Sequence, residues 1–192
     1  MSSSLTQLCD LVSTVALANA AKLQEQFVQL VRDEGSDVDP ESVFTILAFM
    51  NWTFAQGVWS NLSNTHLRRD LQVQLKDALI LRLARALTKS SSAPDIAARA
   101  VTLTDEFNDY VRHYKSRMPA LGDADSRTAT LFAFERIQER CGVEDGVMNR
   151  VIPRLISAEG LSAEVESVAQ EVNKAAALKK AGFFSRLFGG RS

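Results

Sequence analysis

Apolar residues recur every three or four positions along most of the chain, which is the spacing of one face of an α-helix. Residues 5–34 show the pattern through Leu5, Leu8, Val12, Val15, Leu23, Phe27, Leu30 and Val31. No long stretch alternates apolar and polar residues with the period of two that is typical of a half-buried strand. The pattern therefore predicts an all-α protein.

The same spacing predicts a series of helices separated by short loops. Their approximate ranges are 5–34, 40–62, 66–89, 95–117, 126–140, 144–158 and a last helix from 162. Gly35 follows the first helix, and Asp39 with Pro40 begins the second. Pro153 lacks a backbone N–H, so we expect it to kink or interrupt the sixth. Because short loops favour antiparallel neighbours, we predict a bundle of six or seven mostly antiparallel helices with a short amphipathic C-terminal appendage.

The residues expected to be buried in the middle helices follow from the same periodicity. They are Leu67, Leu71, Leu75, Ala78, Leu79, Leu83, Ile96, Ala100, Phe107, Val111, Tyr114, Met118, Leu131, Phe134 and Ile137. We divide the chain into a helical bundle domain (1–160), a C-terminal helix (161–180) and an amphipathic basic tail (181–192).

The predicted helix over residues 40–62 carries apolar residues on two opposite faces. One face gathers Val43, Leu47, Met50, Phe54 and Val58, and the other carries Phe49, Trp52, Gln56 and Trp59 without any charge. Burial of both faces would make this helix central in the bundle. The second face also suits two other uses, a homodimer interface or a pocket for an apolar ligand.

Composition and charge indicate a cytoplasmic protein. The chain has a net charge of −1 and enough apolar residues (46%) for a folded core. Its two cysteines, Cys9 and Cys141, lie far apart, as expected for two thiols rather than a disulfide scaffold. The N-terminus lacks the basic start of a signal peptide, and no apolar run is long enough to span a membrane.

The motifs of common enzyme classes are absent from the sequence. It contains neither phosphate-binding glycine loop, GxxxxGK[ST] or GxGxxG, and neither HExxH nor GxSxG. His113 stands one helical turn after Asp109, which is typical of a surface pair and too few ligands for a metal. We therefore predict no catalytic residues, no cofactor and no metal site.

Two charged segments receive similarly plain interpretations. The acidic loop 33–41 lacks the ligand order of a calcium-binding loop, so we interpret it as solvated. Arg82, Arg85 and Lys89 form a basic stripe, but Asp70 and Asp77 interrupt the basic run and the chain as a whole is not basic. We predict no binding to nucleic acid.

The last residues, KKAGFFSRLFGG from 179 to 190, are the segment that points to a function. Residues 1–50 contain two bases and seven acids, a balance of −5, whereas five bases and no acid follow Glu171. A helical projection gathers the apolar Phe183, Phe184, Leu187 and Phe188 on one side. Lys179 and Arg186 lie opposite, Lys180 falls inside the apolar arc, and Arg191 is a further base near the end. Such a pattern is typical of a helix that lies in a membrane interface.

This segment resembles the C-terminal membrane-targeting sequence of MinD-type division ATPases. The shared order is two lysines, a glycine, apolar residues, a base, Leu-Phe and Gly-Gly, over about a dozen residues. The rest of the chain lacks the phosphate-binding loop of those ATPases. The resemblance therefore implies a mode of membrane contact and no ATPase activity.

Together these features favour a non-enzymatic cytosolic adaptor or scaffold whose tail contacts an anionic surface on the inner face of the membrane. Three alternatives stay open. The tail docks on a protein partner, or it packs against its own bundle, or the protein binds an apolar ligand beside Trp52, Gln56 and Trp59.

Overall fold

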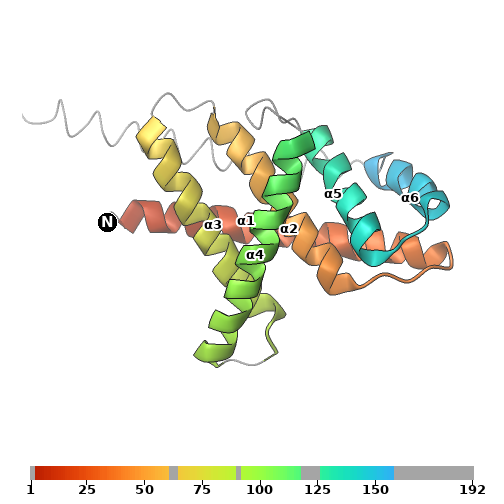
Figure 1. The fold of residues 1–192 in the computed structure, drawn as a ribbon, viewed down its shortest axis with the longest axis horizontal. Helices are drawn as coiled ribbons and strands as arrows, with labels where there is room; N and C mark the ends of the chain where they lie inside the picture. Colours follow the sequence, from red (N-terminus) through yellow and green to blue (C-terminus); the bar gives the residue numbers. More distant parts are fainter. Residues whose placement is uncertain (1–2, 61–64, 90–91, 118–125, 158–192) are drawn as a thin grey trace, which may run out of the picture.

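The computed structural model describes residues 3–60, 65–89, 92–117 and 126–157, and this part of the chain forms six α-helices without a strand (Figure 1). The side chains of residues 3–8, 11, 54–60, 65–71, 126–128 and 156–157 lie outside the description. The helices are α1 (Ser3–Asp33), α2 (Pro40–Ser60), α3 (Thr65–Leu87), α4 (Ala93–Arg117), α5 (Ser126–Cys141) and α6 (Asp145–Ser157). The all-helical prediction is confirmed, while the proposed helix 161–180 and tail 181–192 lie outside the described residues.

The loop between α1 and α2 has the end signals that the sequence predicted. Gly35 has a φ of 76°, which favours glycine, and Ser36 N–H donates to the Val31 carbonyl to close α1. The Asp39 carboxylate accepts hydrogen bonds from the N–H groups of Glu41 and Ser42 at 3.2 and 3.0 Å. The side-chain bond with Ser42 lowers the pKa of Asp39 from its ordinary value.

Helix α2 lies at the centre of the arrangement. The long α1 runs across the view in Figure 1, with α2 and α3 packed against it and α4 in front of α2. α2 contacts α1, α3, α4 and α5. Its described side chains are buried on both faces, including Leu47 and Met50 on one and Phe49 and Trp52 on the other. Packing on every side explains why this helix carries almost no charge.

On α1 and α3, every predicted core position whose side chain is described is buried or partly buried. On α4 the buried positions are Leu103, Phe107, Tyr110 and Tyr114, so the expected set missed Leu103 and Tyr110. On α5 the expectation for Leu131 is wrong, because this side chain is 39% exposed. Phe132 is buried in its place, with its ring against those of Tyr110 and Tyr114 at centroid distances of 5.1 Å. Leu67, Leu71 and Met118 lie outside the described side chains.

Helix α6 continues through Pro153, so the interruption does not occur, while the kink stays a prediction. Proline removes only one intrahelical hydrogen bond, and Pro153 is exposed, so water can satisfy the carbonyl that loses its donor. Glu34 at the end of α1 holds this helix with its carboxylate, which accepts from Arg150 at 2.6 Å and Arg154 at 3.1 Å.

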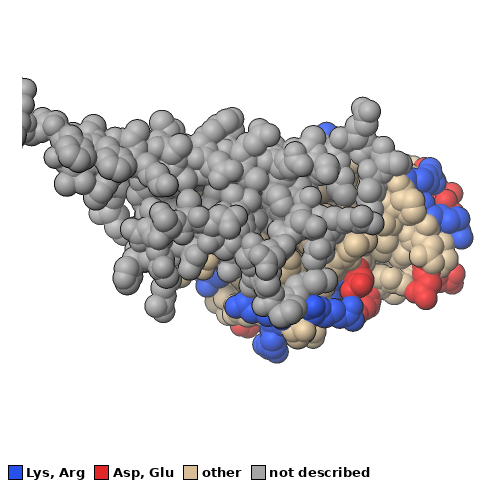
Figure 2. Space-filling model, turned by 90° about the horizontal axis from the view of Figure 1, so that it is seen from above, with Lys and Arg blue, Asp and Glu red and all other residues tan. Residues whose placement is uncertain are grey.

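On the face that Figure 2 shows, the described residues carry charges of both signs side by side. None of the described helices has a segment both long and apolar enough to cross a bilayer.

Candidate functional site

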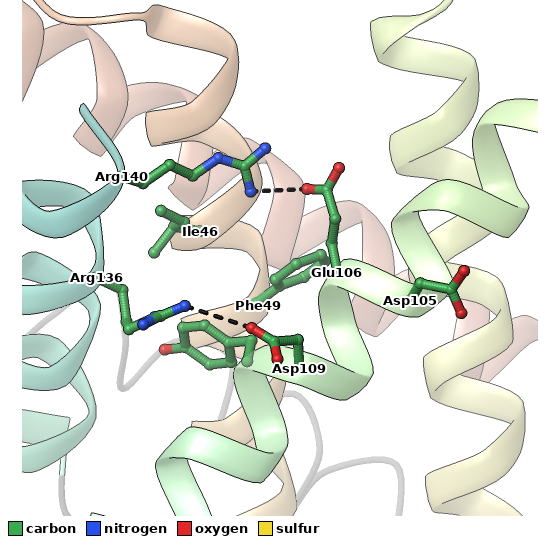
Figure 3. A pocket seen from close by; sticks show the side chains of 8 residues that line it. Ile46, Phe49, Asp105, Glu106, Asp109, Arg136 and Arg140 are labelled. Carbon is green, nitrogen blue, oxygen red and sulfur yellow. Dashed lines mark hydrogen bonds and ion pairs between the residues drawn. The ribbon is translucent and has the colours of Figure 1, made fainter.

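A groove of about 300 Å³ lies where α4 and α5 flank the central helix α2. It is lined by Ile46, Phe49, Asp105, Glu106, Asp109, Tyr110, Arg136 and Arg140 (Figure 3). This volume is at the lower end of the range for small-molecule sites, so it suits a small ligand. We call this feature the α2–α4–α5 groove.

The floor of the groove is apolar and buried. Ile46 and Phe49 come from α2 and Tyr110 from α4, and all three are buried. The Phe49 ring packs edge-on against Phe107, with centroids 5.2 Å apart, and lies 5.7 Å from the ring of Tyr110. Burial raises the pKa of the Tyr110 phenol well above its ordinary value, so this group stays protonated at physiological pH. The floor therefore contributes shape and apolar surface rather than charge.

The two walls of the groove carry opposite charges. Glu106 and Asp109 project from α4, whereas Arg136 and Arg140 project from α5, one turn apart on the same face (Figure 3). Arg140 donates to Glu106 at 2.8 Å, and Arg136 lies 3.4 Å from Asp109. Asp105 points away from both arginines in this view. The inward-facing charges therefore balance, two against two.

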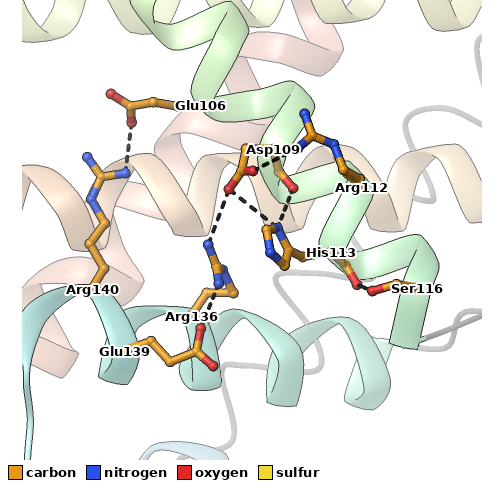
Figure 4. Close-up of polar contacts among 8 residues, drawn as sticks. All are labelled: Glu106, Asp109, Arg112, His113, Ser116, Arg136, Glu139 and Arg140. Atoms are coloured by element: carbon orange, nitrogen blue, oxygen red, sulfur yellow. Dashed lines mark hydrogen bonds and ion pairs between the residues drawn. The ribbon is translucent and has the colours of Figure 1, made fainter.

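Asp109 is the more loosely held of the two inward-facing carboxylates of the groove. Its carboxylate lies 3.4 Å from Arg136, 3.5 Å from Arg112 and 3.3 Å from the Nδ1 of His113 (Figure 4). Charge-assisted hydrogen bonds are shorter, at about 2.7–2.9 Å. Arg136, by contrast, has a second and closer partner in Glu139 at 2.6 Å. Asp109 thus has three partners and no short bond.

His113 makes the local pair that its spacing predicted. Its Nδ1 lies 2.9 Å from the backbone carbonyl of Asp109 as well as near the carboxylate. The described residues contain no cluster of histidine, cysteine and acidic side chains that could hold a metal ion. Cys9 is buried and Cys141 is partly buried, and burial raises the pKa of the Cys141 thiol.

The other residues singled out from the sequence fall in two places. Phe49 forms part of the groove floor, and Trp52 is buried with its ring edge-on to Phe107 at 4.7 Å. The side chains of Gln56 and Trp59 lie outside the description. So does the whole amphipathic tail: Lys179, Lys180, Phe183, Phe184, Arg186, Leu187, Phe188 and Arg191.

Sequence reasoning missed the charged walls of the groove. The available signal was complementary spacing, with acids at Glu106 and Asp109 and bases at Arg136 and Arg140 beside buried positions on their helices. This spacing shows that each pair shares a face, but not that the two faces meet. Only the packing of α4 and α5 on either side of α2 brings the two pairs together.

The titratable side chains that line the groove are carboxylates, arginines and a phenol. Its two inward-facing carboxylates are engaged by arginines, and its phenol stays protonated. No serine, cysteine or histidine is among the described residues that line it. Comparison of the chain with protein-family models, with curated proteins and with solved structures finds no match.

Proposed function

We propose that the chain is a non-enzymatic helical adaptor that binds an anionic membrane surface reversibly through residues 179–191. The observation that carries this proposal is the sequence of the tail, in which four large apolar side chains are interleaved with bases and no acid. A segment of this kind binds at the lipid interface through both its apolar face and its charges.

The expected strength of this contact is modest. Each large side chain half-buried in the interface contributes about 1 kcal/mol, and each base near anionic lipid contributes about as much. Ordering the roughly ten residues of the segment costs a comparable amount. A single tail therefore binds weakly and reversibly, and stable attachment requires self-association or a second contact.

Co-sedimentation with vesicles rich in phosphatidylglycerol tests the proposal. The full chain is compared with a 1–178 truncation and with a full-length variant carrying Phe183→Ser and Phe184→Ser, which keeps every charge. We expect both altered forms to lose most of the binding, because the bases alone give only weak, salt-sensitive attraction. Ser185→Ala, on the polar side of the segment, is the matched control and should bind like the unaltered chain.

Equal pelleting of the full chain and the truncation at low salt would refute membrane contact through the tail. Pull-downs with the same variants separate membrane contact from docking on a protein. Loss of a bound protein with unchanged vesicle binding would favour the protein partner instead.

A further inference from the structure

The long helix α1 buries side chains of different sizes along its length. Its second half buries Leu23 and Phe27, and the Phe27 ring stacks on Phe134 of α5 with the centroids 5.5 Å apart. Residues 9–20, which we call the α1 strap, bury smaller side chains, none of them larger than valine: Cys9, Val12, Ser13, Ala16 and Ala20. Because apolar stabilisation grows with the buried area, the α1 strap is held less strongly than the rest of the helix.

A polar group of α2 lacks a partner where the α1 strap covers it. A narrow gap between α1, α2 and α3 is lined by Val12, Ser13, Ala16, Asn51, Trp52, Leu75 and Leu79. The Asn51 Nδ2 atom donates to the Leu47 carbonyl at 3.0 Å, but its Oδ1 atom has no hydrogen-bond partner among the described residues. The gap has no room for a water molecule that could serve as one. Since a buried acceptor without a partner is costly, opening this surface to water relieves the cost.

The helix itself is weakened within the α1 strap. The Ser13 hydroxyl donates to the Cys9 carbonyl and the Thr14 hydroxyl to the Asp10 carbonyl, both at 2.7 Å. Such bonds from a side chain to the preceding turn slightly destabilise a helix and often bend it. The ion pair that joins the strap to α3, Arg82 with Asp10 at 3.0 Å, contributes little because its side chains are 36% and 52% exposed.

We infer that the α1 strap opens away from α2 and α3 while the remaining helices stay folded, and that it thereby controls access to the surface beneath it. The second half of α1 is the fixed end, because Phe27 packs on α5 and Glu34 binds two arginines of α6. The uncovered surface carries the Asn51 amide together with the apolar side chains of Leu75 and Leu79. Local openings of this kind need less free energy than global unfolding.

Alkylation of Cys9 tests this inference, because this thiol lies in the α1 strap and its residue is only 4% exposed. The full chain is treated with iodoacetamide at a series of urea concentrations, and mass spectrometry measures the labelling of Cys9 and Cys141 separately. We expect Cys9 to react at least about tenfold faster than the globally unfolded fraction allows. Its rate should be nearly independent of urea below the unfolding transition, because a local opening exposes little surface. Cys141, at the end of α5, is the internal reference.

The cause of the opening is assigned with the variant Asn51→Leu, which removes the unpaired oxygen and places apolar atoms in the gap. We expect it to slow the alkylation of Cys9 about tenfold and to leave that of Cys141 unchanged. Thr53→Val is the matched control, since Thr53 is equally buried on α2 but its hydroxyl donates to the Met50 carbonyl at 2.8 Å. This control should not slow the alkylation of Cys9.

The inference is overturned if Cys9 reacts only as fast as global unfolding allows and with the same dependence on urea. It is also overturned if a folded Asn51→Leu variant, checked by circular dichroism, labels at Cys9 as fast as the unaltered chain or faster. The first result comes from the unaltered chain, so a variant that fails to fold leaves the test intact. Both results are independent of the tail and of its membrane contact.

Discussion

The aromatic cluster joins α2 to α4, whereas the charged walls of the groove join α4 to α5, and the two hold their helices in different ways. Phe49, Trp52, Phe107 and Tyr110 are buried and touch one another at centroid distances of 4.7–5.7 Å. The ion pairs from α4 to α5 lie outside this cluster, and their side chains are between about one fifth and one half exposed.

The aromatic cluster and the ion pairs therefore differ in how much they contribute to the stability of the fold. Apolar burial depends on the shapes that fill the core and is lost when a side chain is removed. A half-exposed ion pair contributes little, because water and salt replace either partner. The helices are therefore fixed by the aromatic cluster, and the charges around the groove are able to change partners without unfolding the protein.

Removal of an aromatic ring should produce the largest effect. Phe107 packs edge-on against both Phe49 and Trp52, so Phe107→Ala leaves a cavity in contact with two rings. We expect a loss of about 3–5 kcal/mol in the free energy of unfolding, measured by urea denaturation followed by circular dichroism. Val101→Ala on the same helix is the control, because Val101 is 66% exposed and its truncation should cost less than about 0.5 kcal/mol. Equal losses in the two variants would mean that the cluster is not the fixed part.

The fold was largely predictable from the sequence because helix periodicity and end signals are local. Gly35 and Asp39 define the loop before α2 through bonds within a few residues, and both were predicted. The prediction chose Leu131 instead of Phe132 because the two apolar residues are adjacent on a short helix. The local pattern does not show which of them faces a neighbouring helix. The burial of Phe132 depends on Tyr110 and Tyr114, which come from a different helix.

The groove was not predictable for the same reason. Asp109 was identified through His113, its neighbour on α4, whereas its contact with Arg136 joins residues 27 positions apart. Charged residues that lie on the surface of a bundle and those that face each other across a groove have the same local pattern. Only the placement of both helices against α2 distinguishes them.

Asp39 gives an intermediate effect, since it is a charge with fixed short-range partners. Asp39→Ala removes the cap of α2 and should lower the free energy of unfolding by about 1 kcal/mol at pH 7. The bond with Ser42 lowers the folded-state pKa below the ordinary 3.8. This contribution is therefore present above the unfolded pKa and is lost as the pH falls through the folded value.

Urea denaturation of both proteins at a series of pH values measures this effect. The difference in stability between them should be constant near neutral pH and shrink below about pH 4. Asp37→Ala is the matched control in the same loop, because the Asp37 side chain is 86% exposed and lies 3.8 Å from Arg32. A difference that grew on acidification would contradict the assigned role of Asp39.

The smallest effect is expected for the outermost ion pair between α4 and α5. Arg117 and Glu135 lie 2.5 Å apart, but both side chains are about half exposed. In a double-mutant cycle of Arg117→Gln and Glu135→Gln, we expect a coupling energy of at most about 0.5 kcal/mol, decreasing further with added salt. A coupling above about 2 kcal/mol, insensitive to salt, would place this pair with the aromatic cluster as a fixed element.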